Sequence, residues 1–214
     1  MDMDHKVRPI NYSFSAVGGN TVGFASAVTG SNWVLTNNTV PDGLGHRVVI
    51  RNNSATDFSS LTALIAGLDS DGNNQSETVS LPGPSVTTTS VFYYKYIESV
   101  VPSSTIGNAT MRIGWGPFSL SKTICLDGRA NSESGFSLSV SGTTFYSIQK
   151  THGNIFDGNS QLLKWFIMDG FSGLSSSISG SIPIDAQAIR ILISLGLSNP
   201  SFDLYLFQPN GYGS

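Results

Sequence analysis

The chain has few of the residues on which covalent or metal-dependent folds rely. It contains one cysteine, Cys125, in 214 residues, which excludes an intramolecular disulfide framework and a cysteine-rich zinc site. Cys125 stands in a predicted strand with no histidine near it in sequence, so we interpret it as a small core residue rather than a nucleophile. Without disulfides, the protein is expected to be made in a reducing cytoplasm.

Charged residues are also scarce. They make up 12% of the chain, about half the usual ~25%, and the formal net charge is −3. A disordered chain would combine low hydrophobicity with high net charge, and a coiled coil would need many Ala, Glu, Lys, Leu and Arg residues. With a pI near 5.4, the protein as a whole is not expected to bind nucleic acid.

Long apolar runs are missing as well. Residues 1–6 are charged and no apolar run of a secretory signal follows them, so none is expected. The most apolar stretch, residues 188–197, is interrupted by Arg190, Ser194 and Gly196 and is far shorter than the ~20 residues of a membrane helix. We therefore expect no membrane partner.

Recognisable reaction chemistry is absent from the sequence. The three histidines, His5, His46 and His152, lie far apart, in no metal-ligand spacing, and are expected at the surface or in turns. No nucleophile elbow, phosphate loop or dinucleotide fingerprint occurs. Residues 69–73 lack the spacing of an EF-hand loop, so we predict a plain hairpin turn, with a structural cation as the alternative. We expect no catalytic residues, cofactor or metal, and no enzyme activity.

Period-two patterns of apolar residues, by contrast, are frequent. Residues 136–140, 189–195 and 202–206 each place apolar side chains at alternate positions, as strands with one buried face do. Gly, Pro, Asn and Asp clusters separate such runs at roughly 8–12 residues, the spacing of a sandwich or barrel. The sequence therefore predicts an all-β protein.

The stretch Gly114–Pro117 favours a domain boundary. Pro117 cannot continue a central ladder and the flanking glycines weaken one. We predict two tandem antiparallel β-sandwich domains, jelly-roll or Ig-like, spanning residues 1–117 and 118–214. Each part has room for its own core, and a single barrel is the alternative.

Several large apolar side chains fall at outward positions of the predicted strands. Such residues need a protein neighbour to cover them, so we predict a protein interface that includes Tyr93, Leu192, Tyr205, Phe207 and Tyr212. Phe92, Tyr94 and Tyr96 are expected to share one strand face, as core or interface packing. An exposed platform for sugar rings is the alternative for these three aromatics.

Several hairpin motifs resemble those of tailed-bacteriophage virion structural proteins. Residues 67–79, with Asp69, Asp71, Gly72 and Asn73 before Glu77-Thr78, are similar to a hairpin common in such proteins. Residues 87–97 and 109–115 resemble the strands that follow it. Residues 135–143 and 182–191 resemble a second small virion module, from which Lys150–Asn154 departs. These stretches cover about half the chain.

The resemblance implies a non-enzymatic phage virion protein, made in the host cytoplasm and located in the virion. The first expectation is a capsid cement or decoration protein, a symmetric oligomer whose partner is the major capsid protein or another virion protein. A neck, tail or fibre-anchoring component is one alternative. A carbohydrate-binding module for host-surface glycans is another, and a hydrolase fragment is a weaker third.

Overall fold

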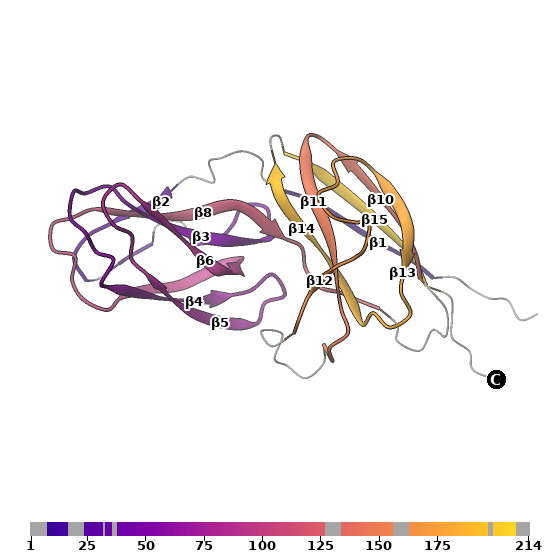
Figure 1. The fold of residues 1–214 in the computed structure, drawn as a ribbon, viewed down its shortest axis with the longest axis horizontal. Helices are drawn as coiled ribbons and strands as arrows, with labels where there is room; N and C mark the ends of the chain where they lie inside the picture. Colours follow the sequence, from indigo (N-terminus) through magenta and orange to yellow (C-terminus); the bar gives the residue numbers. More distant parts are fainter. Residues whose placement is uncertain are drawn as a thin grey trace, which may run out of the picture. The chain divides into compact units, whose positions relative to one another are not determined.

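The computed structural model describes residues 8–16, 24–31, 33–35, 38–126, 134–155, 163–196 and 199–208. No helix occurs among these residues, and accordingly none is found in them that could span a membrane. The pairings between strands are antiparallel. The predicted all-β class is thereby confirmed (Figure 1).

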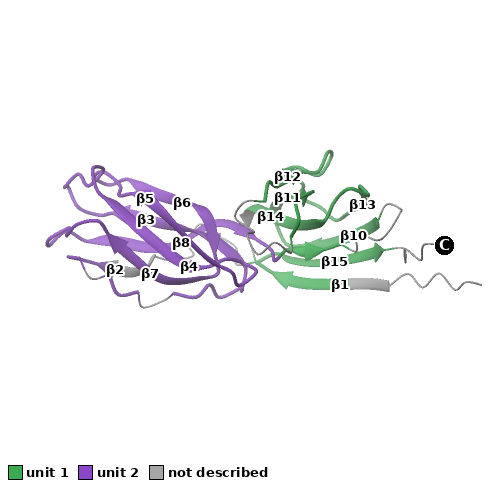
Figure 2. Ribbon diagram, turned by 90° about the horizontal axis from the view of Figure 1, so that it is seen from below, with its two compact units in different colours: residues 1–16, 123–214 green, residues 17–122 purple. Residues whose placement is uncertain are grey.

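The strands fall into two groups that match two compact units of the chain. Unit 1 comprises residues 1–16 and 123–214, and unit 2 comprises residues 17–122 (Figure 2). The strands of unit 1 are β1 (Arg8–Ser15), β9 (Ile124–Cys125), β10 (Ser134–Ser141), β11 (Thr144–Thr151), β12 (Phe166–Ile167), β13 (Ile178–Ile182), β14 (Ala188–Gly196) and β15 (Ser201–Gln208). Those of unit 2 are β2 (Phe24–Val28), β3 (Gly45–Asn52), β4 (Thr62–Leu68), β5 (Asn74–Ser80), β6 (Thr87–Tyr94), β7 (Tyr96–Pro102) and β8 (Met111–Leu120).

This division differs from the expected one at residue 117 in two respects. The N-terminal strand β1 joins the C-terminal unit, because it pairs with β15 along its whole length, from Arg8 opposite Gln208 to Ser15 opposite Ser201. Unit 2 extends to Lys122, because β8 continues through Pro117. The local residue pattern cannot predict this pairing of β1 with β15, because the two strands lie far apart in sequence.

Pro117 is accommodated inside β8 by an irregular pairing. Ser119 lies opposite His46 and Trp115 lies opposite Val48, so three residues of β8 face Arg47 alone. On its other side, β8 pairs with β2 only as far as Gly114. A proline in such a bulge lies outside the regular pairing with β3, which is why that pairing resumes beyond it at Ser119.

Unit 1 contains one sheet in the order β1-β15-β10-β13 and a second in which β11 lies between β12 and β14, with β9 also paired to β14. Phe202, Leu204 and Leu206 are fully buried, as their alternation predicts. The Tyr146 ring of β11 packs edge-on against the Phe202 ring at a centroid distance of 5.7 Å, which joins the two sheets. Burial raises the pKa of Tyr146 to about 12, and its hydroxyl donates to the Ser176 carbonyl at 2.6 Å.

The expected core role of Cys125 is wrong. Cys125 is exposed, whereas its neighbour Ile124 is buried. Since β9 has only two residues and successive side chains of a strand point to opposite faces, only one of them can enter the core.

Unit 2 contains the sheets β2-β8-β3-β6 and β5-β4-β7, whose inward side chains form one hydrophobic core. The first sheet contributes Val48, Ile50, Met111, Ile113 and Trp115, and the second contributes Ala63, Ile65, Val79, Ile97 and Val100.

The aromatic run from Phe92 to Tyr96 passes between these sheets, so the predicted single aromatic face is wrong. Strand β6 ends at Tyr94 and β7 begins at Tyr96, in different sheets. Tyr94 is completely buried and Phe92 is partly buried. The intervening Lys95 donates its backbone N–H to the Leu68 carbonyl at 2.9 Å.

His46 is buried rather than at the surface, which corrects the expectation for this residue. Its ring nitrogens lie 2.9 Å from the Gly116 carbonyl and 2.9 Å from an Asp42 carboxylate oxygen. Asp42 also accepts from the Leu44 N–H at 3.0 Å. The imidazole therefore links the segment before β3 to the bulge of β8, which is a reason for a histidine to enter the interior.

Replacing Asp42 by alanine is expected to destabilise the protein by about 1–3 kcal/mol, because a buried imidazole nitrogen then loses its hydrogen-bond partner. Asp42→Asn should cost less, since the amide keeps an acceptor for Leu44 and a donor or acceptor for His46. Urea unfolding of both variants measures the difference. Equal stabilities for the two variants would contradict the structural role of this contact.

Candidate interaction surface

Two exposed aromatic side chains mark the outward face of the β1-β15-β10-β13 sheet. Tyr205 and Phe207 lie on β15 at alternate positions and are 41% and 44% exposed. The residues between and before them, Leu206 and Leu204, are completely buried on the opposite face. The strand therefore has apolar side chains on both faces, and only one of these faces is covered within the described residues.

Small side chains surround the two rings. The strand register places Asn11 of β1 and Ser137 of β10 on either side of Tyr205, and Gly135 of β10 next to Phe207. On β13, Ser179 and Ser181 lie opposite Ser137 and Gly135. Because residues directly opposite in an antiparallel pair share one face, the rings stand above a floor of short polar residues.

The polar groups of this face are already partly ordered. The Ser13 hydroxyl donates to Asp203 at 2.6 Å, and the hydroxyls of Ser141 and Ser201 lie 2.6 Å apart. Among the described outward side chains of β1, β15, β10 and β13, one is acidic, that of Asp203. A face with so little charge and two large rings has the composition of the buried centre of a protein interface.

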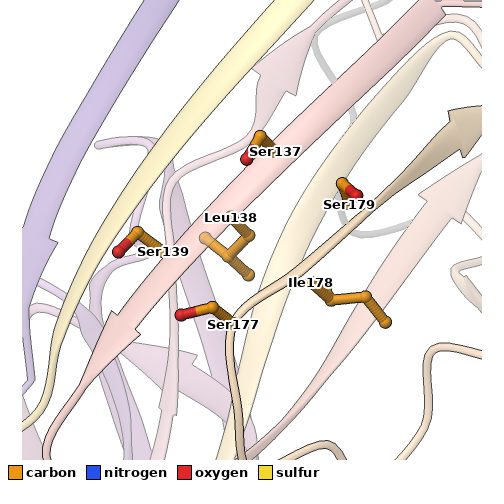
Figure 3. Close-up of a pocket in the computed structure, with 6 residues that line it drawn as sticks. All are labelled: Ser137, Leu138, Ser139, Ser177, Ile178 and Ser179. Carbon is orange, nitrogen blue, oxygen red and sulfur yellow. The ribbon is translucent and has the colours of Figure 1, made fainter.

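A depression of about 480 Å³ adjoins this region between β10 and the segment that enters β13. Figure 3 shows its lining, which consists of Ser137, Leu138, Ser139, Ser177, Ile178 and Ser179. The Val140 N–H donates to the Ser177 hydroxyl at 2.9 Å, so this segment continues the contact of β13 with β10. The serine hydroxyls of this lining can form hydrogen bonds, and its two aliphatic side chains can pack against a ligand. A serine needs an adjacent base to act as a nucleophile, and no base lines this depression.

The structure brings together two of the five residues predicted for an interface, Tyr205 and Phe207. Tyr93 belongs to β6 in unit 2, where it is partly buried beside Arg47. Leu192 is partly buried on β14, opposite Ser147. Tyr212 lies outside the described residues. The prediction of an interface at these positions stays a prediction.

The small residues around the rings were not singled out from the sequence. Ser137 and Ser139 alternate with buried Phe136 and Leu138, and this alternation does indicate that the serines point outward. That Ser137 lies opposite Tyr205, and Ser139 opposite Asp203, could not be inferred, because the pairing of β10 with β15 joins distant parts of the chain.

The other candidate sites are accounted for locally. The Asp69 carboxylate accepts from the backbone N–H groups of Asp71 and Asn73 at 2.9 and 2.8 Å, and Gly72 has a φ of 93°. These contacts are those of an Asx-stabilised hairpin turn. No group of three or more His, Cys, Asp or Glu side chains suited to a metal ion occurs in the part of the chain that the structure describes.

Comparisons with known proteins identify no family for the chain. No protein-family model matches it, and no curated protein matches its sequence. Among solved structures, the VP2 subviral particle of infectious bursal disease virus is similar at 12% identity with a TM-score of 0.24, over 97% of this chain and 72% of that one. The major capsid protein P2 of bacteriophage PM2 is similar at 8% identity with a TM-score of 0.20, over 96% of this chain and 100% of that one. Neither similarity is high enough to assign the fold or function of these capsid proteins to this chain.

Proposed function

We propose that the chain is a non-enzymatic structural protein of a bacteriophage virion that docks on a protein neighbour through the face around Tyr205 and Phe207. The observation that supports this proposal is the exposure of both rings on a sheet face with little charge. The phage-like hairpin motifs in residues 67–79 and 135–143 supply the class of particle. We further infer that each unit is a β-sandwich of the jelly-roll or Ig kind.

Within this class, the function we propose is capsid cement or decoration. One unit would dock on the major capsid protein and the other would stabilise or extend the contact, and symmetric copies would add avidity. At about 25 cal/mol per Å², an interface of about 800 Å² per partner provides a large gross hydrophobic gain, much of which is offset by lost rigid-body freedom. Aromatic residues such as Tyr205 and Phe207 typically contribute most of the net binding free energy that is left.

The number of copies per virion tests this proposal. Quantitative mass spectrometry of purified particles is expected to find this chain in many copies, at a fixed ratio to the major capsid protein. A handful of copies would instead favour a neck, tail or fibre-anchoring component. Absence from purified particles would refute a virion role.

A further inference from the structure

The three arginines of residues 17–122 all lie on the outward face of one sheet of unit 2. Arg47 and Arg51 alternate with buried Val48 and Ile50 along β3, and Arg112 lies on the neighbouring β8. We call this surface the arginine face. Its other members are Val49 of β3, Thr87, Thr89 and Tyr93 of β6, and Gly114 and Phe118 of β8.

Arg51 and Arg112 are directly opposite each other in the antiparallel register of β3 and β8. Like charges in this position destabilise a sheet. In the described part of the chain, no carboxylate within ion-pair distance offsets their repulsion. Both side chains are exposed, so their guanidinium donors are available to a ligand.

Arg47 is held in place at the other end of the arginine face. Its guanidinium carbon lies 5.1 Å from the centre of the Tyr93 ring and 5.8 Å from that of Phe118. Its Nε is buried and has no hydrogen-bond partner in the described structure. The two cation–π contacts orient this guanidinium without neutralising it.

Uncharged, mostly small residues separate the two ends. Arg47 and Arg51 are four positions apart along β3, which corresponds to about 13 Å. Val49, Thr89 and Gly114 are neighbours between them, and the hydroxyl-bearing Thr87 and Thr89 are exposed. Glu77, whose carboxylate reaches β6, accepts instead from the backbone N–H groups of Val91 and Phe92 at 2.8 and 2.9 Å.

We propose that the arginine face binds an anionic polysaccharide whose carboxylates lie on separate sugar rings. One carboxylate would bridge Arg51 and Arg112, whose guanidinium groups each carry several N–H donors, and a second would reach Arg47. The sugar hydroxyls would bond to Thr87 and Thr89, and the apolar faces of the rings would stack on Phe118, which is 38% exposed, and on the accessible part of Tyr93. A charged sugar chain combines all of these groups in one ligand.

A nucleic acid fits this face less well. Duplex DNA carries about one charge per 1.7 Å and needs a long basic track, whereas three arginines can meet only a few phosphates. Acidic residues also outnumber basic ones in residues 17–122, so no long-range positive field steers a polyanion to the unit. A plain acidic protein segment would account for the arginines but not for the flanking threonines and rings.

The proposal is tested with the full-length chain and polygalacturonate, with neutral dextran and single-stranded DNA as comparison ligands. The wild-type protein is expected to bind polygalacturonate, and Arg51→Gln with Arg112→Gln to weaken binding about tenfold or more in isothermal titration calorimetry. Lys122→Gln, which removes one positive charge from an exposed residue beyond the end of β8, should leave the affinity unchanged. The double variant should melt at the same temperature or higher, because it relieves a like-charge contact.

Three results would overturn the inference. These are the absence of polygalacturonate binding to the wild-type protein, an equal loss of binding in the Lys122 variant, and tighter arginine-dependent binding of DNA than of polygalacturonate. The outcome is independent of the proposed virion role, which the copy number in purified particles measures separately.

Discussion

Residues 118–214 on their own are expected to aggregate rather than fold. This fragment has the length of the predicted C-terminal domain but lacks β1, which pairs with β15 over eight residues. Without β1, the edge of β15 exposes its backbone N–H and C=O groups next to the apolar side chains of Phe202, Leu204 and Leu206. The fragment also loses the stacking of Phe14 on Phe202, whose ring centroids lie 5.0 Å apart, and the Ser13–Asp203 hydrogen bond.

The matched control is a chain in which residues 1–16 are joined to residues 123–214 by a flexible Gly/Ser linker. This chain has the same C-terminal strands and regains β1, so it should be monodisperse and unfold cooperatively. Residues 17–122 alone should also fold, because they contain a complete two-sheet core. Size-exclusion chromatography and amide hydrogen exchange measure these outcomes. Cooperative folding of residues 118–214 with the stability of the linked control would contradict the structural role of β1.

Replacing Tyr205 and Phe207 by serine is expected to abolish co-sedimentation with the virion while leaving the fold intact. Both rings point away from the core, so the change in unfolding free energy should stay within about 0.5 kcal/mol. If the two rings anchor the docking contact, each should contribute about 2 kcal/mol or more to binding, which is roughly a 30-fold loss of affinity per ring. The combined loss would remove bound protein from the particle fraction.

Phe145 provides the control for this experiment. It is 40% exposed, belongs to the same unit and lies on β11 in the other sheet, so Phe145→Ser removes a comparable ring from a different surface. This variant should co-sediment like the wild-type protein. Retention of the Tyr205/Phe207 double variant on particles, or an equal loss for Phe145→Ser, would exclude this face as the docking surface.

The strands were predictable from the sequence because the relevant signals are local. The alternation of Phe202, Leu204 and Leu206 predicted a strand with one buried face, and these three side chains are completely buried. The turn residues of 71–73 likewise predicted the hairpin between β4 and β5. Each of these signals depends on the backbone preferences and side-chain periodicity of fewer than ten adjacent residues.

The errors occur where a residue's environment depends on a distant partner. The residue type predicts that Pro117 interrupts the pairing, but the bulge opposite Arg47 tolerates it. The sequence predicts His46 at the surface or in a turn, but Asp42 and the Gly116 carbonyl satisfy its hydrogen bonds in the interior. Alternation predicts one face for Tyr94 and Tyr96, but the chain changes sheets between them. Asp42 lies only four residues from His46, but the Gly116 carbonyl and the β3 residues opposite Pro117 are distant in sequence and could not be identified from adjacent residues.

The order of apolar, small and turn residues was enough to establish that this protein is built of strands, with Tyr205 and Phe207 on the opposite side of β15 from its core residues. The tertiary structure alone decided that β1 completes the C-terminal unit, that small residues of β1 and β10 flank those two rings, and that Arg51 faces Arg112. The physical reason is that side-chain periodicity is a property of a single strand. Register between strands is instead selected by the burial and hydrogen bonding of residues that are distant in sequence.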